Sequence, residues 1–219
     1  MTRAEKYRQL LCEVGQKVSA AGFVAANDGN LSILLNDDTV LITPTNVSKS
    51  AMKPGEMAAV TLAGKCTGKN RPSSEYRLHL AIYKNCPDVK AIVHTHAPYA
   101  TAWAVSGQGL TEAVLPEVVT TIGIIPLVKY ETPSTAKFAE RVADAARRHA
   151  VLLLQNHGLI ATGNDLWSAF YKTERAEHAF KIMTIARLLG NVHQLSAAEL
   201  DDLFRTYEVS AKIRAIFNK

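Results

Sequence analysis

Apolar side chains near the start of the chain recur every three or four residues, which is the spacing of one helical face. They are Tyr7, Leu10, Leu11, Val14 and Val18. We expect an amphipathic helix over residues 2–21 that packs this face against the core. The polar sequence Asn27-Asp28-Gly29-Asn30 then interrupts the pattern.

Short apolar runs after this break have the length of strands. Residues 31–35 and 39–43 flank Asn36-Asp37-Asp38, so together they predict a β-hairpin. Residues 57–62 predict another strand, and a further strand is expected around Val118–Ile125.

Two more apolar runs lead directly to histidine. Val89–His94 and Val151–Leu154 are short and almost entirely apolar, as buried strands are. The first run ends at His94, and the second leads into Gln155-Asn156-His157-Gly158.

Helical signals lie between and after these strands. Pro72-Ser73-Ser74-Glu75 opens one helical run, and Ser196 begins a Ser-x-x-Glu capping box before another. Other helices are expected at about 97–106, at about 134–149 and over 165–189, where Gly190 closes the last one.

Composition supports one folded unit. The chain has 219 residues, 47% of them apolar and 21% charged, as in compact globular proteins. No linker or repeat interrupts it, so we expect a single α/β domain over residues 1–219 with helices outside a largely antiparallel or mixed sheet. The longest apolar stretch, around residues 150–154, is too short to cross a bilayer. Three cysteines without C-x-x-C spacing fit a reducing cytoplasm.

The net charge of +5 changes little in this picture. The basic residues are scattered along helices and are not gathered with aromatic residues, so we expect no nucleic-acid partner. A small anion such as a substrate phosphate also suits this charge.

Three histidines form the strongest candidate for chemistry. His94 and His96 lie two residues apart, so in a strand both side chains project to the same face and can reach one metal ion. His157 follows another apolar strand and precedes Gly158, which lets backbone approach closely. Three histidines leave an open coordination position, as a catalytic Zn²⁺ requires.

Neighbouring polar residues have two possible roles each. Glu75, expected in the first turn of its helix, is either a catalytic carboxylate or a favourable partner of the helix dipole. Ser73 and Ser74 are either N-caps or part of a phosphate site at a helix N-terminus. His79, one turn after Glu75, is expected to pair with that carboxylate.

Several motifs together resemble a known family. In chain order they are Gly29-Asn30-Leu31-Ser32, Ile42-Thr43-Pro44-Thr45, Pro72-Ser73-Ser74-Glu75, His94-Thr95-His96 and Asn156-His157-Gly158-Leu159-Ile160. They are similar to those of the class II aldolase/adducin family, and most closely to its L-fuculose-phosphate aldolase branch, over residues of about 5–190.

The resemblance implies a three-layer α/β/α fold with a central, mainly antiparallel sheet, in a homotetramer with active sites at subunit interfaces. It also implies one Zn²⁺ per chain, held by the three histidines with Glu75 beside them. Glu75 would be the acid/base catalyst, and Tyr207 of a C-terminal tail would close over the site. The substrate phosphate would be held by Asn30, Thr45, Asn46, Ser73 and Ser74.

The reaction implied is retro-aldol cleavage of a ketose 1-phosphate to dihydroxyacetone phosphate and an aldehyde. A 4-epimerase, a dehydratase or a decarboxylase on the same fold are alternatives, and an adducin-like interaction module without enzymatic activity is another. Two departures bear on the substrate: relatives often have glycine at the position of Asn46, and a tyrosine that fuculose enzymes take from a neighbouring subunit has no match in residues 115–119.

Overall fold

The computed structural model describes residues 1–217, so the last two residues of the expected 1–219 domain lie outside it. Its strands are β1 (Asn30–Leu34), β2 (Thr39–Ile42), β3 (Ala58–Thr61), β4 (Ala91–Thr95), β5 (Leu127–Val128), β6 (Val151–Leu154) and β7 (Gly158–Gly163). Its α-helices are α1 (Arg3–Ala20), α2 (Tyr76–Asn85), α3 (Pro98–Val105), α4 (Pro116–Thr121), α5 (Ala136–Ala146), α6 (Leu166–Leu189), α7 (Ala197–Thr206) and α8 (Ala211–Phe217), and a 3₁₀ turn covers Pro54–Glu56.

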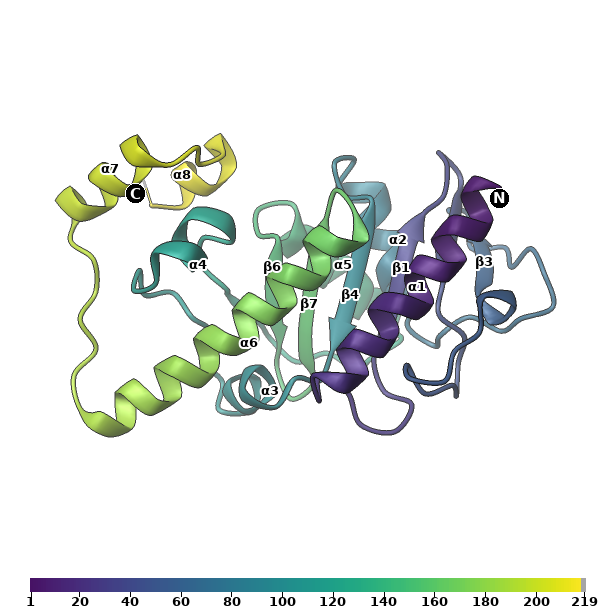
Figure 1. Cartoon of the computed structure of the whole chain (residues 1–219), viewed down its shortest axis with the longest axis horizontal. Helices are drawn as coiled ribbons and strands as arrows, with labels where there is room; N and C mark the ends of the chain where they lie inside the picture. Colours follow the sequence, from purple (N-terminus) through teal and green to yellow (C-terminus); the bar gives the residue numbers. More distant parts are fainter. Residues whose placement is uncertain (218–219) are drawn as a thin grey trace.

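Within the described residues the strands form one seven-stranded sheet in the order β3-β2-β1-β4-β7-β6-β5 (Figure 1). Neighbouring strands are antiparallel except β5 and β6, which are parallel. The expected hairpin of β1 and β2 is confirmed, with Ser32 opposite Ile42. β4 lies in the middle of the sheet, between β1 and β7.

Helices cover both faces of the sheet, which confirms the three-layer α/β/α architecture. Alternate strand residues point to opposite faces. Leu31 and Ile33 belong to the core under α1, α3 and α6, whereas Val40 and Ile42 belong to the core under α2 and α5. In Figure 1, α1 and α6 cross the near face of the sheet.

One sequence prediction about secondary structure is wrong. The strand expected around Val118–Ile125 is instead the short helix α4, which begins with Pro116 as a favourable first residue and buries Val118 and Val119. Packing of these side chains decides the local structure over their β-propensity. In addition, β7 was not expected as a separate strand, although its six residues are all buried.

The last two helices pack on α4. Phe204 and Val209 form a small separate cluster with Ala113 and Val119. α7 starts at Ser196 with the expected capping box to Glu199. No helix within residues 1–217 is long and apolar enough to cross a membrane.

Candidate metal centre

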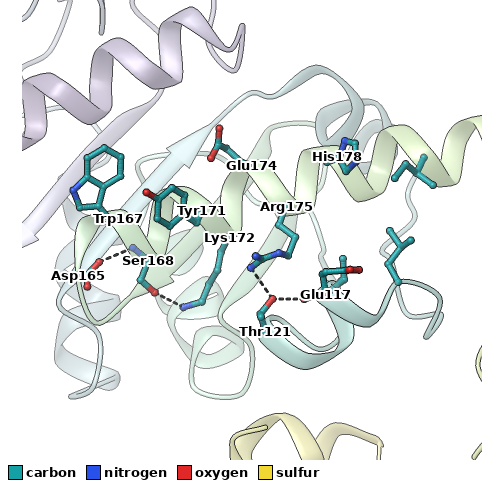
Figure 2. A pocket seen from close by; sticks show the side chains of 13 residues that line it. Glu117, Thr121, Asp165, Trp167, Ser168, Tyr171, Lys172, Glu174, Arg175 and His178 are labelled. Carbon is teal, nitrogen blue, oxygen red and sulfur yellow. Dashed lines mark hydrogen bonds between the residues drawn. The ribbon is translucent and has the colours of Figure 1, made fainter. Parts of the chain in front are cut away.

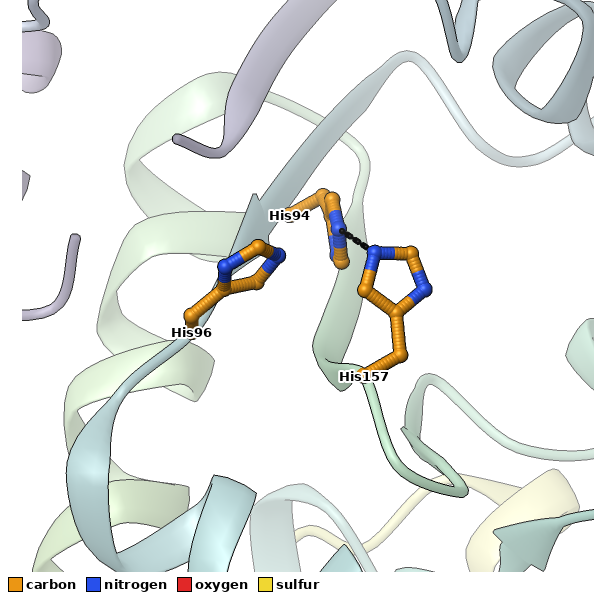
Figure 3. A group of neighbouring side chains, drawn as sticks. All are labelled: His94, His96 and His157. Carbon is orange, nitrogen blue, oxygen red and sulfur yellow. Dashed lines mark hydrogen bonds between the residues drawn. The ribbon is translucent and has the colours of Figure 1, made fainter. Parts of the chain in front are cut away.

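Three histidines meet where β4 and the β6–β7 turn come together. His94 is the fourth residue of β4, His96 follows the strand, and His157 lies in the turn before β7 (Figure 3). Gly158 permits this approach, because a Cβ there would collide with the carbonyl oxygen of Thr95 and come within 2.8 Å of the His96 ring. The close approach expected of this glycine is confirmed.

The nitrogens of the cluster are spaced for one metal ion. Each histidine offers a ring nitrogen, and these atoms lie within 4.8 Å of one another. The Nε2 atoms of His94 and His157 are 3.3 Å apart, close to the ~3.3–3.4 Å edge of a tetrahedron with Zn–N bonds of ~2.0–2.1 Å. Nε2 of His96 is buried without a hydrogen-bond partner within residues 1–217.

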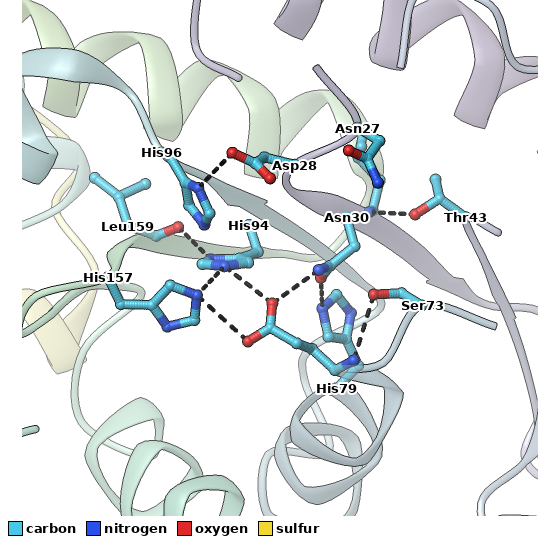
Figure 4. A network of polar contacts seen from close by, with 12 residues as sticks. Asn27, Asp28, Asn30, Thr43, Ser73, His79, His94, His96, His157 and Leu159 are labelled. Carbon is cyan, nitrogen blue, oxygen red and sulfur yellow. Dashed lines mark hydrogen bonds and ion pairs between the residues drawn. The ribbon is translucent and has the colours of Figure 1, made fainter. Parts of the chain in front are cut away.

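The other ring nitrogen, Nδ1, has a protein partner in two of these histidines and so orients their rings. Nδ1 of His94 donates to the carbonyl oxygen of Leu159 at 2.9 Å, which leaves the lone pair of Nε2 directed at the cluster. Nδ1 of His96 lies 3.4 Å from Oδ2 of Asp28. Figure 4 shows both contacts. Such outer partners are typical of histidines that bind metal through the other nitrogen.

Glu75 approaches the histidine cluster from the start of α2. The sequence predicted that Glu75 would lie in the first turn of its helix. It is instead the N-cap residue of α2, and its side chain makes no capping bond. Its Oε2 lies 3.1 Å from Nε2 of His94, and its Oε1 lies 3.4 Å from Nε2 of His157. Lone pairs from a carboxylate and from imidazole converge here, so the arrangement calls for a cation between them.

Electrostatics favour an ionised carboxylate at this point. Burial alone would raise the pKa of Glu75, but the charge and hydrogen bond of His94, together with His157 and Asn30, lower it well below its usual range. Burial lowers the pKa of His157 to about 3, which leaves a neutral ring. For His94 burial opposes protonation, yet Glu75 raises its pKa, so positive charge is stabilised beside the carboxylate.

A second buried histidine stands behind Glu75. The spacing predicted that His79 would pair with Glu75, but its hydrogen bonds go to Asn30 and Ser32 instead. Its Nε2 lies 2.5 Å from Oδ1 of Asn30, and Nδ2 of Asn30 donates to Oε2 of Glu75 at 2.9 Å. The side-chain amide of Asn30 thus already has two protein partners. Its expected role in binding the substrate phosphate stays a prediction.

The other expected phosphate residues lie on two adjacent loops beside Glu75. The backbone N–H of Thr45 donates to Arg71, and that of Ser73 donates to Thr43. Ser73 is buried, while Asn46 and Ser74 are exposed. Asn46 has φ of 61°, a left-handed conformation that suits the glycine expected from relatives better. Phosphate binding by these loops stays a prediction.

Lys49 is a polar residue of this region that sequence patterns do not reveal. Its side chain is 1% exposed, and Nζ donates to the carbonyl oxygens of Asn27 and Val47 at 2.9 and 2.8 Å. Burial lowers its pKa to about 8, although Asp28 acts in the opposite direction. The lysine thus joins the loop before β1 to the loop after β2 and brings positive charge beneath both.

Tyr207 lies apart from this centre. It ends α7 and is exposed, on a tail that packs against α4. Ile213 and Ile216 of the same tail line a cleft together with Gly163, the last residue of β7. His157 directly precedes the first residue of β7, so the tail and His157 lie at opposite ends of this strand. The structure does not bring Tyr207 and the histidines of one chain together, and its catalytic role stays a prediction.

A surface groove of about 860 Å³ lies between α4 and the outer side of α6 (Figure 2). None of the expected site residues lines it. Its cations already have protein partners, since Lys172 donates to Ser168 and Arg175 donates to Thr121. The histidine cluster therefore remains the candidate site.

The chain is similar to known proteins over most of its length. The model of the family described as Class II Aldolase and Adducin N-terminal domain matches residues 9–184. A 3-oxo-tetronate 4-phosphate decarboxylase of Pectobacterium atrosepticum is 33% identical, over 93% of this chain and 94% of that protein. An L-fuculose phosphate aldolase of Methanococcus vannielii is 37% identical, over 73% of this chain and 86% of its own length. The crystal structure of YgbL from Escherichia coli superposes with a TM-score of 0.84 at 30% identity, covering 92% of this chain and 99% of that one.

Proposed function

Because the chain belongs to the class II aldolase and adducin N-terminal domain family, we propose that it is a metal-dependent lyase that breaks a carbon–carbon bond next to a ketone in a phosphorylated sugar derivative. The observation that supports this most is the cluster of His94, His96 and His157 around one point with the carboxylate of Glu75 against it. A module that only binds other proteins has no need of this set.

The donor set favours zinc. Three imidazole nitrogens with an open fourth position suit Zn²⁺ better than Mg²⁺ or Ca²⁺, which prefer oxygen ligands. When bound, Zn²⁺ supplies positive charge that polarises the substrate carbonyl and stabilises the negative charge that develops on the neighbouring oxygens.

Glu75 is placed to move the proton. Oε2 is held by Asn30, whereas Oε1 is buried and has no hydrogen-bond partner within residues 1–217. The ionised carboxylate can take the proton of a substrate hydroxyl, and after the bond breaks it can return that proton to carbon.

The first candidate substrate is a phosphorylated 3-oxo sugar acid. Several relatives that match at least 90% of this chain are 3-oxo-tetronate 4-phosphate decarboxylases. In such an acid the bond between C1 and C2 breaks, CO₂ leaves, and its electron pair remains on C2 next to the C3 carbonyl. Glu75 protonates C2, water supplies the proton for the product hydroxyl, and dihydroxyacetone phosphate results.

The second candidate is the ketose 1-phosphate aldolase expected from the sequence, supported by the 37% identity to an L-fuculose phosphate aldolase. The same electron pair stays on the same kind of carbon, but an aldehyde leaves in place of CO₂. Here Glu75 would take the proton of the hydroxyl on the leaving carbon, whose oxygen becomes the aldehyde oxygen, and would pass that proton to the carbon next to the ketone. The two reactions therefore share the metal, Glu75 and the phosphorylated product.

The test is to incubate the zinc-loaded protein with 3-oxo-tetronate 4-phosphate and, separately, with L-fuculose 1-phosphate. We expect release of CO₂ and dihydroxyacetone phosphate from the first, and loss of activity after chelation or in His157→Ala. Faster aldehyde release from the second would establish the aldolase instead. Turnover of neither compound, or full metal binding by His157→Ala, would contradict the proposed function.

A further inference from the structure

Two rows of polar side chains face each other behind Glu75. Along α2, residues 75, 79 and 83 recur every four positions and so share one helical face. Along β1, Asn30 and Ser32 are two residues apart and so share one face of the sheet. Asn30 is also directly opposite His94 of β4, which ties this row to the metal centre.

The two rows join in one unbroken chain of hydrogen bonds. The hydroxyl of Tyr83 lies 2.7 Å from Oγ of Ser32, which lies 2.6 Å from Nδ1 of His79. Nε2 of His79 then lies 2.5 Å from Oδ1 of Asn30, whose Nδ2 donates to Glu75 at 2.9 Å. All five side chains are buried.

The ionised carboxylate at one end fixes the direction of every bond. A carboxylate only accepts, so Asn30 must present its NH₂ group to Glu75 and its carbonyl oxygen to His79. Nε2 of His79 must then carry the proton and Nδ1 must accept from Ser32. Ser32 has a single proton, so Tyr83 donates to it.

Burial supports the same assignment. It lowers the pKa of His79 to about 3, so the ring is neutral and carries one N–H. That N–H is the only group in the chain of bonds that can hold the carbonyl oxygen of Asn30. The reverse orientation of the amide would place its oxygen 2.9 Å from a carboxylate oxygen of Glu75.

We propose that His79 is a positioning residue: it locks the amide of Asn30, and Asn30 in turn holds Oε2 of Glu75, which keeps both carboxylate oxygens against the metal centre. This inference rests on the proposed function, in which Glu75 moves the proton. The hydrogen bond to Oδ1 of Asn30 comes from His79.

The tautomer of His79 can be measured without any substrate. Imidazole ¹⁵N NMR of the wild-type protein should show Nε2 of His79 protonated and Nδ1 unprotonated at neutral pH. A ring protonated on Nδ1 would reverse the chain of bonds and overturn the inference, whatever the reaction proves to be.

Two replacements of His79 separate positioning from packing. The side-chain nitrogen of glutamine reaches about as far as Nε2 of histidine, whereas that of asparagine reaches only about as far as Nδ1. In His79→Gln the donor to Asn30 is kept, and we expect kcat within about threefold of wild type. In His79→Asn it is lost, and we expect kcat to fall about 10–100-fold with KM and zinc content nearly unchanged.

The deciding measurement repeats His79→Asn in an Asn30→Ala background. If His79 acts through Asn30, the second replacement should change kcat by less than about twofold there. Tyr83→Phe, which removes a hydroxyl from the far end of the same network, is the matched control and should leave kcat within about twofold.

An equal loss of kcat from His79→Asn in both backgrounds, or no loss in the wild-type background, would refute positioning through Asn30. Failure of the proposed function has a different signature. There, the wild type would turn over neither compound, or Glu75→Gln would remain active, while the NMR result on His79 would stand unchanged.

Discussion

Glu75 carries the chemical argument at the scale of single residues. Its carboxylate faces two imidazole Nε2 atoms at 3.1 and 3.4 Å, and it caps no backbone group of α2. The dipole-partner role considered from the sequence is therefore weaker than the catalytic one, because the side chain turns away from the helix.

Replacing Glu75 by glutamine should separate chemistry from structure. The amide is nearly isosteric but cannot accept the proton, so we expect a folded, zinc-loaded protein whose kcat falls by ~10²–10⁴. Metal content by atomic absorption and kcat on the same preparation check this. An active Glu75→Gln enzyme with slightly reduced stability would return Glu75 to a structural role.

His79 should make the free energy of unfolding depend on pH. Its pKa is about 3 in the folded chain against an ordinary 6.5, so between these values the unfolded chain binds the additional proton. Stability therefore rises with pH across this window and is complete above it. The contribution lost between pH 7.5 and 5.5 is about 1.4 kcal/mol.

Urea unfolding of the metal-free protein at both pH values measures this loss, with His79→Gln as the control because it does not titrate. The wild type should lose more stability than the variant. Equal losses in the two proteins would mean that His79 is not buried in its neutral form.

The histidine cluster could be found from the sequence because spacing along a strand and a following glycine are local features. His94 and His96 needed only the period of a strand, and Gly158 marked the approach of His157. Lys49 and the bonds of His79 could not be found. The burial of Lys49 leaves no local pattern, and the partners of His79 lie in β1, far away in the sequence.

At the scale of elements, α6 holds the start of α3, which follows His96 closely in the chain. The carboxylate of Glu177 accepts from the backbone N–H groups of Tyr99 and Ala100 at 2.9 and 2.8 Å. α3 begins at Pro98, two residues after His96, and has no side-chain cap of its own. A residue about 80 positions away therefore does what an N-cap usually does.

Replacing Glu177 by glutamine should destabilise the fold by about 1–2 kcal/mol, because a buried, charge-assisted pair of bonds at a helix N-terminus is weakened. Glu174→Gln on the exposed side of the same helix is the control and should stay within about 0.5 kcal/mol of wild type. Urea unfolding compares the two. Similar values for both variants would show that Glu177 does not hold α3.

Elements with strong periodic signals were predictable, and those set by tertiary packing were not. The long helix expected over 165–189 is α6, because its regular apolar spacing ends at Gly190. The region of α4 has short β-branched runs that satisfy a strand or a helix equally well, and contact with α6 and the tail decides the outcome.

For the whole molecule, the three-layer fold was expected because the motifs resemble those of a family with that fold. They do not specify how copies of the chain associate. The tail that carries Tyr207 lies at the opposite end of β7 from His157, so a catalytic Tyr207 would have to act on a neighbouring copy.

The expected homotetramer can be tested through the free end of α6, which extends past the sheet in Figure 1. Leu188 and Leu189 there are 83% and 84% exposed, and a pair of leucines largely exposed to water is typical of a surface that another chain covers.

We expect the wild type to sediment at about 95 kDa, the mass of four copies of the chain. Leu188→Glu with Leu189→Glu should give smaller species and lower activity, whereas Lys6→Glu, which changes the charge by the same amount on exposed α1, should not. A wild type that sediments as a single chain at micromolar concentration, with full activity on dilution, would show that the site is complete within one copy.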